Sequence, residues 1–199
     1  KSIQKITYLS KLNMKDNFST QAAEYAIYRP TYPQELYDYL FSLVKSKDTA
    51  WDCATGNGQV ARVLAQHFQS VYATDISEKQ LNQAMKLPNI IYLVESSDKA
   101  NVPDQSFDLI TVAQAIHWFN FDAFYGEVKR TLKPDGLIAV IGYGLMFIDK
   151  KVDQAIHKLY EDILGKYWDS ERRYIEEGYK TIPFPFEEIV APHFQIKTS

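Results

Sequence analysis

The sequence has one cysteine, Cys53, and four histidines among its 199 residues. An internal disulfide needs two cysteines and a cysteine-built metal cluster needs several, so both are excluded. No H-E-x-x-H motif places two histidines at the spacing of metal ligands. We therefore expect no metal centre, and we expect Cys53 to be a small buried hydrophobic side chain.

The chain also lacks long apolar runs and long basic runs. No stretch approaches the roughly 20 apolar residues that span a membrane, and residues 1–15 lack the apolar core and cleavage site of a signal peptide. The formal net charge is −3, unlike the basic surface of a nucleic-acid-binding protein. The G-x-S-x-G motif of hydrolases is missing too. These absences predict a cytoplasmic protein that acts on a small molecule, without nucleic-acid or membrane partners, and leave its oligomeric state open.

Hydrophobic residues make up 46% of the chain and charged residues 24%, which is typical of a folded globular domain. The most informative stretch begins with a strand-like run at 49–53 and continues into the small-residue turn Ala54-Thr55-Gly56-Asn57-Gly58. Residues 59–68 then show helical spacing of apolar side chains. Such a strand, turn and helix bring backbone N–H groups close to a nucleotide-like ligand, but the same unit also occurs as a purely structural connection.

Strand-like and helix-like segments alternate along the rest of the chain. Further strands are predicted at 71–75, 89–95, 107–113 and 137–142, and helices at 34–45, from Ser77 onward, at 121–132 and at 151–164. The first of these helices has an apolar stripe of Leu36, Tyr39, Leu40 and Leu43. A turn at 133–136 should precede the last strand. This order predicts a doubly wound α/β fold with a mostly parallel sheet.

Two acidic residues follow predicted strands. Asp75 comes 19 residues after Gly56, near the separation at which a carboxylate accepts hydrogen bonds from both hydroxyls of a ribose. A carboxylate there disfavours a 2′-phosphate and hence NADP. The alternative is that Asp75 only interacts with the dipole of the following helix. Asp98 could reach the exocyclic amine of an adenine, or it could be an ordinary loop carboxylate.

Several motifs occur together and in order. They are Asp52-Cys53-Ala54-Thr55-Gly56-Asn57-Gly58, Thr74-Asp75-Ile76-Ser77, Ser97-Asp98, Pro103-Asp104-Gln105-Ser106-Phe107-Asp108 and Leu132-Lys133-Pro134-Asp135-Gly136. This set resembles the class I S-adenosylmethionine-dependent methyltransferases of the methyltransferase domain 11 type, over residues 18–145. The segments 25–33 and 114–119, with parts of 167–186, resemble more specifically the branch that includes trans-aconitate methyltransferase-like enzymes.

The resemblance implies S-adenosylmethionine as the cofactor and assigns its contacts to nine residues. The turn beneath the methionine part would be formed by Asp52, Ala54, Thr55, Gly56 and Gly58. The remaining contacts would come from Asp75 on the ribose, Ile76 on the adenine ring, Asp98 on the adenine amino group and Gln114 beside the sulfonium. Ala54 stands where the family usually has the first of three glycines, which leaves less room for a close backbone approach.

The same resemblance implies a fold of which this chain holds only a part. Such enzymes normally continue with a final antiparallel strand and more of the substrate cap. We therefore expect a Rossmann-like sheet that lacks its last strand, although residues 194–197 begin to look like one. The predicted organisation is a single methyltransferase domain over 1–199, with a cap at 18–48, a cofactor-binding core at 49–145 and a partial C-terminal cap at 146–199.

The predicted reaction is an in-line transfer of a methyl group to a small organic acceptor, which needs alignment above all. His117 is the best candidate for a general base, and its alternative is a structural histidine beside Trp118. If the acceptor is a carboxylate, no base is needed and Arg29 would be its partner. Tyr25, Tyr28 and Trp118 would contact the substrate. The alternative for the segment around Arg29 is a lid in which the guanidinium stacks on a tyrosine.

Two other functions compete with methyl transfer. A nicotinamide-dependent oxidoreductase shares the strand, turn, helix and ribose carboxylate, but it normally has G-x-G-x-x-G, and the chain offers only Gly56-x-Gly58. A non-catalytic module that binds S-adenosylmethionine is the second alternative.

Overall fold

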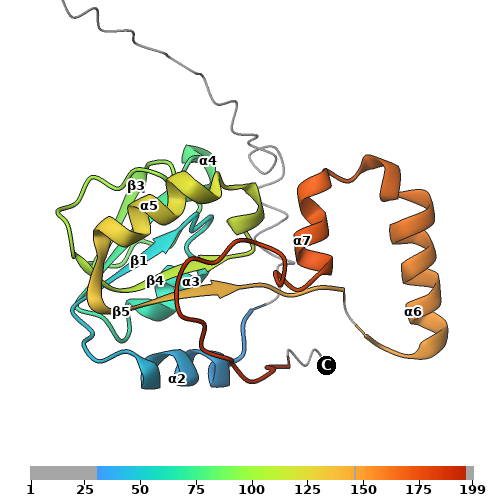
Figure 1. The fold of residues 1–199 in the computed structure, drawn as a ribbon, viewed down its shortest axis with the longest axis horizontal. Helices are drawn as coiled ribbons and strands as arrows, with labels where there is room; N and C mark the ends of the chain where they lie inside the picture. The colour runs from blue at the N-terminus through green and yellow to red at the C-terminus, as the bar shows by residue number, and fades with distance from the viewer. Residues whose placement is uncertain (1–30, 146, 196–199) are drawn as a thin grey trace, which may run out of the picture.

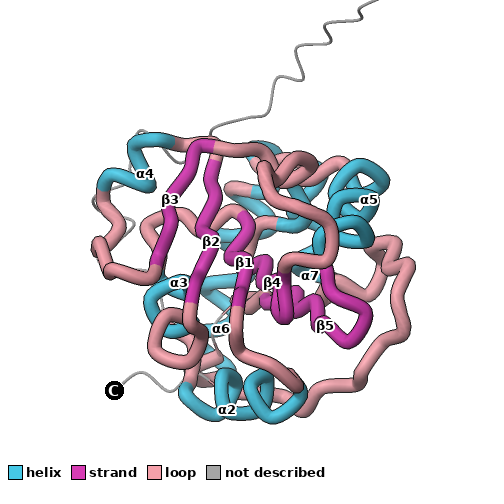
Figure 2. The backbone as a smooth tube through the Cα atoms, turned by 90° about the vertical axis from the view of Figure 1, so that its left-hand side faces the viewer, coloured by secondary structure: helices cyan, strands magenta, loops and turns pink. Residues whose placement is uncertain are grey.

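The structure, a computed structural model, describes residues 31–145 and 147–195 (Figure 1). Five strands of this part form one parallel sheet in the order β3-β2-β1-β4-β5 (Figure 2). The strands are β1 (Thr49–Cys53), β2 (Ser70–Asp75), β3 (Ile90–Val94), β4 (Phe107–Ala113) and β5 (Leu132–Ile141). The prediction of a doubly wound, Rossmann-like α/β fold is confirmed.

Helices lie on both faces of the sheet. The α-helices are α2 (Gln34–Leu43), α3 (Gln59–Leu64), α4 (Glu78–Asn82), α5 (Phe121–Thr131), α6 (Lys150–His157) and α7 (Arg173–Glu176). Shorter or irregular turns are η1 (Ile116–Trp118), the π-helical η2 (Lys158–Ile163), η3 (Gly165–Tyr167) and η4 (Ser170–Arg172). No helix in the described ranges is long and apolar enough to cross a membrane.

Two apolar clusters sandwich the sheet, because successive side chains of a strand point to opposite faces. In β1, Ala50 packs with α2 and α3 on one face, whereas Trp51 packs with α5 on the other. Figure 1 shows α5 on one side of the strands and α2 on the opposite side. Both Ala50 and Trp51 are fully buried, as expected for the central strand of a parallel sheet.

Two predictions are wrong in detail, and they concern the buried face of α2 and the start of β5. The first is the apolar stripe of α2. The buried residues of α2 are Tyr37, Leu40 and Phe41, whereas Leu36, Tyr39 and Leu43 are only partly buried. Both sets have helical spacing, so the periodicity of the sequence could not decide between them.

The second error concerns the turn predicted at 133–136. This segment is an irregular stretch within β5, which pairs Leu132 with Phe107 before the register shifts and Leu137 pairs with Leu109. The ammonium group of Lys133 lies 2.7 Å from the carboxylate of Asp108 and links the irregular stretch to β4.

Other boundaries differ by a few residues. α3 ends at Leu64 instead of residue 68, and the helix predicted at 151–164 is α-helical only to His157 before it becomes π-helical. At the possible sixth strand, Phe194 and Gln195 are not in a strand, and residues 196–197 lie outside the described part. The N-terminal segment 18–30 lies outside it as well.

Asp108 connects three pieces of chain at the amino edge of the sheet. Its carboxylate accepts hydrogen bonds from the backbone N–H groups of Asp48 (3.1 Å) and Thr49 (2.9 Å) as well as from Lys133. Its side chain is only 6% exposed. Removal of the carboxylate would therefore leave three partly buried donors without this acceptor, which is costly.

We expect Asp108→Ala to lower the free energy of unfolding by about 2–3 kcal/mol, as measured by urea denaturation. Asp135→Ala is the matched control, because Asp135 forms an ion pair with Lys45 in which both side chains are 72% exposed. Such an exposed pair contributes about 0–1 kcal/mol. Equal losses in the two variants would contradict this role of Asp108.

Candidate functional site

The carboxyl ends of β1, β2 and β4 lie level with one another. Cys53 of β1 is in register with Thr74 of β2 and Val112 of β4, and the strand order reverses between β1 and β4. Open parallel sheets bind ligands at such an edge. The structure therefore gathers the predicted residues that directly follow these three strands.

The turn after β1 contains three residues in the left-handed region. Their φ angles are 55° at Ala54, 59° at Gly56 and 79° at Gly58. Its left-handed φ angle favours glycine at position 58, and a Cβ atom there would lie 2.4 Å from the hydroxyl oxygen of Tyr92, which would have to move. Ala54 adopts the same kind of conformation with a Cβ atom, which costs about 1–2 kcal/mol for an L-residue.

Asp52 supports this turn from inside the fold. Its carboxylate accepts hydrogen bonds from the Thr55 hydroxyl (2.5 Å), the Ala61 backbone N–H (3.0 Å) and the Thr111 hydroxyl (2.8 Å). Asp52 is 1% exposed and Thr55 is 5% exposed. Both therefore shape the turn and connect it to α3 and β4.

Asp75 meets the same turn from β2. Its carboxylate accepts hydrogen bonds from the backbone N–H groups of Gly56 and Ser77, each at 2.8 Å. The side chain is half-buried, and the neighbouring Ile76 is an exposed large apolar residue. An acidic group and an apolar surface thus lie side by side at the edge of the sheet.

Asp98 belongs to the same region. Burial raises the pKa of the Cys53 thiol well above its usual range, and the negative charges of Asp52, Asp75 and Asp98 raise it further. These carboxylates belong to β1, to the end of β2 and to the loop after β3. Asp98 is held by the Ser96 hydroxyl, which donates a hydrogen bond to it.

Gln114 connects the ends of β4 and β5. Its backbone N–H donates to the carbonyl of Ile141 and its side-chain amide donates to the carbonyl of Tyr143, both at 2.8 Å. Its φ angle of 56° is left-handed, so the chain turns sharply at the end of β4. The residues of η1 follow from this turn.

His117 in η1 is nearly enclosed, with 4% of its surface exposed. Its Nδ1 atom lies 3.0 Å from the Tyr179 hydroxyl. Burial above all, together with the positive charge of Arg172, lowers the pKa of His117 to about 4, and Glu171 partly opposes this shift. The imidazole is therefore neutral at pH 7 and a poor proton acceptor, which favours the structural interpretation of His117.

The other predicted catalytic and substrate residues are only partly covered by the structure. Arg29, Tyr25 and Tyr28 lie outside the described residues. Trp118 is partly buried beside His117, with ring centroids 4.7 Å apart. Its indole N–H is buried and has no hydrogen-bond acceptor in the described part of the chain.

Three contributors to this region were not found from the sequence. Thr111 could have been found, because a polar residue in an otherwise nearly apolar strand indicates a buried hydrogen bond. Tyr92 and Tyr179 gave none, since nothing in a sequence shows that a distant tyrosine packs on Gly58 or reaches His117. A surface cavity of about 320 Å³ between α5 and residues 183–185 includes none of the predicted site residues.

Comparison with known proteins agrees with this geometry. Residues 51–140 match the family described as methyltransferase domain. A Dictyostelium discoideum protein named "putative methyltransferase" is 40% identical over 176 residues, which are 86% of this chain and 67% of that protein. The solved structure of a "putative type II methyltransferase" from Anaeromyxobacter dehalogenans has a TM-score of 0.76 at 38% identity, and the match covers 83% of this chain and 70% of that one.

A Saccharomyces cerevisiae protein named "probable S-adenosylmethionine-dependent methyltransferase" is 27% identical over 190 residues, which are 88% of this chain and 62% of that protein. The chain belongs to the class I methyltransferase family, whose cofactor is S-adenosylmethionine. It spans about half to two thirds of the length of the first relatives it matches.

The strain at Ala54 predicts an unusual response to glycine. We expect Ala54→Gly to raise the free energy of unfolding by about 0.5–1 kcal/mol, because relief of the left-handed strain exceeds the entropy that glycine adds to the unfolded chain. Urea denaturation measures the effect. Ala73→Gly, in the buried centre of β2, is the control and should cost about 1 kcal/mol. A loss at Ala54 equal to the loss at Ala73 would contradict the strain.

The neutral state of His117 predicts a pH dependence of stability. The unfolded chain has a histidine pKa near 6.5 and the folded chain has one of about 4, so the unfolded state binds more protons between these values. The contribution of the neutral His117 to the free energy of unfolding is complete above pH 6.5 and is lost as the pH falls toward 4. We expect the stability loss between pH 7.5 and 5.0 to be about 1–2 kcal/mol smaller in His117→Gln than in the wild type.

Urea titrations at the two pH values measure this difference. His157→Gln is the matched control, because the His157 side chain is 47% exposed on α6. The interpretation fails if wild type and His117→Gln lose the same stability on acidification.

Proposed function

We propose that this chain binds S-adenosylmethionine at the carboxyl edge of β1, β2 and β4 and transfers its methyl group to a small organic acceptor. The observation that carries the proposal is the hydrogen bond from the Gly56 backbone N–H to the Asp75 carboxylate. This bond places the glycine-containing turn next to Asp75, which is the acid predicted to bind the ribose in a chain of the methyltransferase family. When bound, the cofactor supplies an electrophilic methyl group on a sulfonium.

The described residues fit the chemistry of this cofactor. The partly exposed Asp75 would accept hydrogen bonds from the ribose hydroxyls, and the exposed Ile76 would pack on the adenine ring. Asp98 would accept a hydrogen bond from the adenine amino group. The left-handed turn at 54–58 would lie beneath the methionine part, with Gln114 on the sulfonium side. The carboxylates of this region also suit a ligand with a positive sulfur.

The acceptor is proposed to be a small molecule, with a carboxylate as one candidate. A carboxylate is already deprotonated at pH 7, so it needs no general base. This agrees with a His117 whose pKa is about 4, and His117 would then position η1 instead of moving a proton. Arg29 stays a predicted partner for such an acceptor. Membership of the trans-aconitate methyltransferase-like branch stays a proposal as well, supported by residues 114–119.

Alignment of donor and acceptor is the main requirement for in-line transfer. We propose that residues 18–48 and 146–199 act as caps over a cofactor-binding core at 49–145. The support is that Tyr179 and the segment around Phe184 pack against the cluster on the α5 face. A module that binds the cofactor without turnover is the remaining alternative, and only a methyl-transfer assay separates the two.

Calorimetric titration of the full 199-residue chain with S-adenosylhomocysteine tests the cofactor site. We expect a dissociation constant in the micromolar range and no binding of NAD. Asp75→Ala should weaken binding at least about 30-fold, which is about 2 kcal/mol, because the charged acceptor for the ribose is lost.

Asp122→Ala is the matched control, since Asp122 is an exposed carboxylate at the start of α5. Circular dichroism would show that both variants are folded. Absence of S-adenosylhomocysteine binding in a folded wild type, or binding of NAD, would refute the proposed site.

A further inference from the structure

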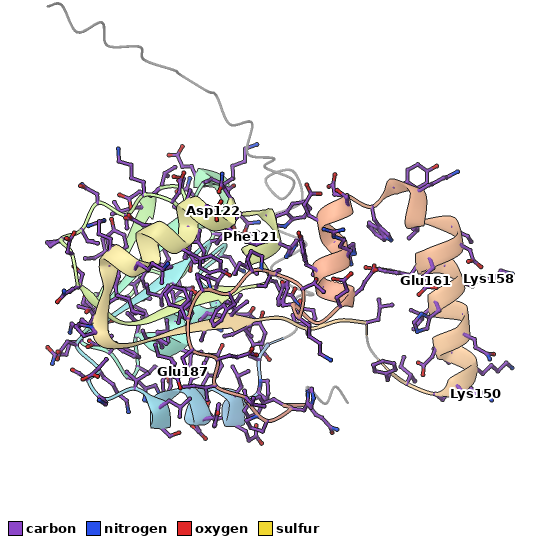
Figure 3. The ribbon with its side chains drawn as sticks, in the orientation of Figure 1. Phe121, Asp122, Lys150, Lys158, Glu161 and Glu187 are labelled. Carbon is purple, nitrogen blue, oxygen red and sulfur yellow. The ribbon has the colours of Figure 1, made fainter. Side chains whose placement is uncertain are left out.

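The segment after α6 returns to the carboxyl edge of the sheet. Tyr174 of α7 packs edge-on against Phe121 at the start of α5, with ring centroids 5.6 Å apart. η4 packs against η1, and the Tyr179 hydroxyl reaches His117. Figure 3 labels Phe121 and Asp122 at the end of α5 that faces α7. Residues 170–179 therefore lie beside the residues that follow β4.

Arg172, the last residue of η4, is held in a fixed orientation. Its guanidinium carbon lies 4.4 Å from the ring centroid of Trp168 and 4.9 Å from that of Tyr160. Its Nε atom donates a hydrogen bond to the Tyr160 hydroxyl. The indole N–H of Trp168 donates to the carbonyl of Tyr160 at 3.0 Å and fixes the two rings relative to each other. Contacts of this kind orient the planar guanidinium and leave its outer N–H groups to bind other molecules.

No carboxylate of the described residues forms an ion pair with Arg172. The neighbouring acid, Glu171, accepts a hydrogen bond from the Ser170 hydroxyl at 3.1 Å. η4, which ends at Arg172, packs against η1. An oriented cation without an acidic partner is suited to bind an anion.

Trp118 supplies a second, independent observation. It lies in η1 next to His117, and its indole N–H is buried with no acceptor in the part of the chain that the structure describes. A buried donor without an acceptor is unfavourable unless a ligand or water supplies one. Trp118 and Arg172 belong to η1 and η4, which pack against each other.

We propose that Arg172 and Trp118 form the site that binds a carboxylate group of the methyl acceptor. This inference rests on the proposed function, because it places the site beside the predicted cofactor. It assigns the recognition to residues other than Arg29 and narrows the acceptor class to small organic acids. The anion pairs with the Arg172 guanidinium, and one of its oxygens accepts the hydrogen bond of the Trp118 indole.

The test uses the full chain saturated with S-adenosylhomocysteine, with benzoate as the probe and benzamide as its neutral isostere. Saturation-transfer NMR titrations measure both affinities. We expect benzoate to bind the wild type in the millimolar range and benzamide to bind at least about tenfold more weakly. Arg172→Gln should weaken benzoate binding at least about tenfold with benzamide binding unchanged, and Trp118→Phe should weaken benzoate binding about threefold.

Arg173→Gln is the matched control. Arg173 is the next residue and is exposed, and its guanidinium stacks on Tyr174, so this change removes the same charge from the same segment. It should leave benzoate binding at the wild-type level. Arg172→Lys keeps the charge without the planar fork and should recover only part of the affinity.

The outcomes separate this inference from the proposed function. If S-adenosylhomocysteine does not bind, the proposed function fails, and the inference fails with it. If it binds with the same affinity to wild type and Arg172→Gln, but benzoate binds neither or both equally, only the anion site is overturned. An equal loss in Arg172→Gln and Arg173→Gln would also overturn it, because the effect would then be one of net charge.

Discussion

The buried carboxylate of Asp52 is the interaction on which the rest of the site depends. A charge at 1% exposure is tolerated only where hydrogen-bond donors surround it, and here the donors come from the turn, from α3 and from β4. The same three bonds that satisfy the charge therefore fix the turn relative to the sheet. Asp75 can meet Gly56 only because that turn is held in place.

Different interactions stabilise the two sides of the site, one around β1 and β2 and the other around η1 and α5. Charge and hydrogen bonds dominate around β1 and β2, whereas aromatic packing dominates where residues 170–186 cover η1 and α5. His117 lies at the junction, where its neutral ring contacts Tyr179 and its surroundings disfavour a second positive charge near Arg172. A neutral histidine there allows the guanidinium to remain the dominant local cation.

The sequence was sufficient to predict the doubly wound fold, the small-residue turn after the first strand and the acids at the strand ends, because each depends on local pattern. The face of α2 could not be predicted, since Leu36 and Tyr37 both fit a helical stripe and the choice depends on packing against the sheet. The start of β5 was missed because Pro134 and Gly136 indicate a turn, while the contact of Lys133 with Asp108 holds the segment on β4. The Arg172 environment combines residues from three separate turns, and no local signal links them.

The position of α6 has a consequence for the local unfolding of this helix. α6 has no buried residue, and Figure 1 shows it standing apart from the sheet. The segment that follows it is nevertheless anchored, because Tyr179, Ile182, Phe184 and Phe186 pack on the α5 face. α6 therefore contributes little to the cooperative unfolding of the whole domain. It can therefore unwind and reform while the core and the anchored C-terminal segment stay folded.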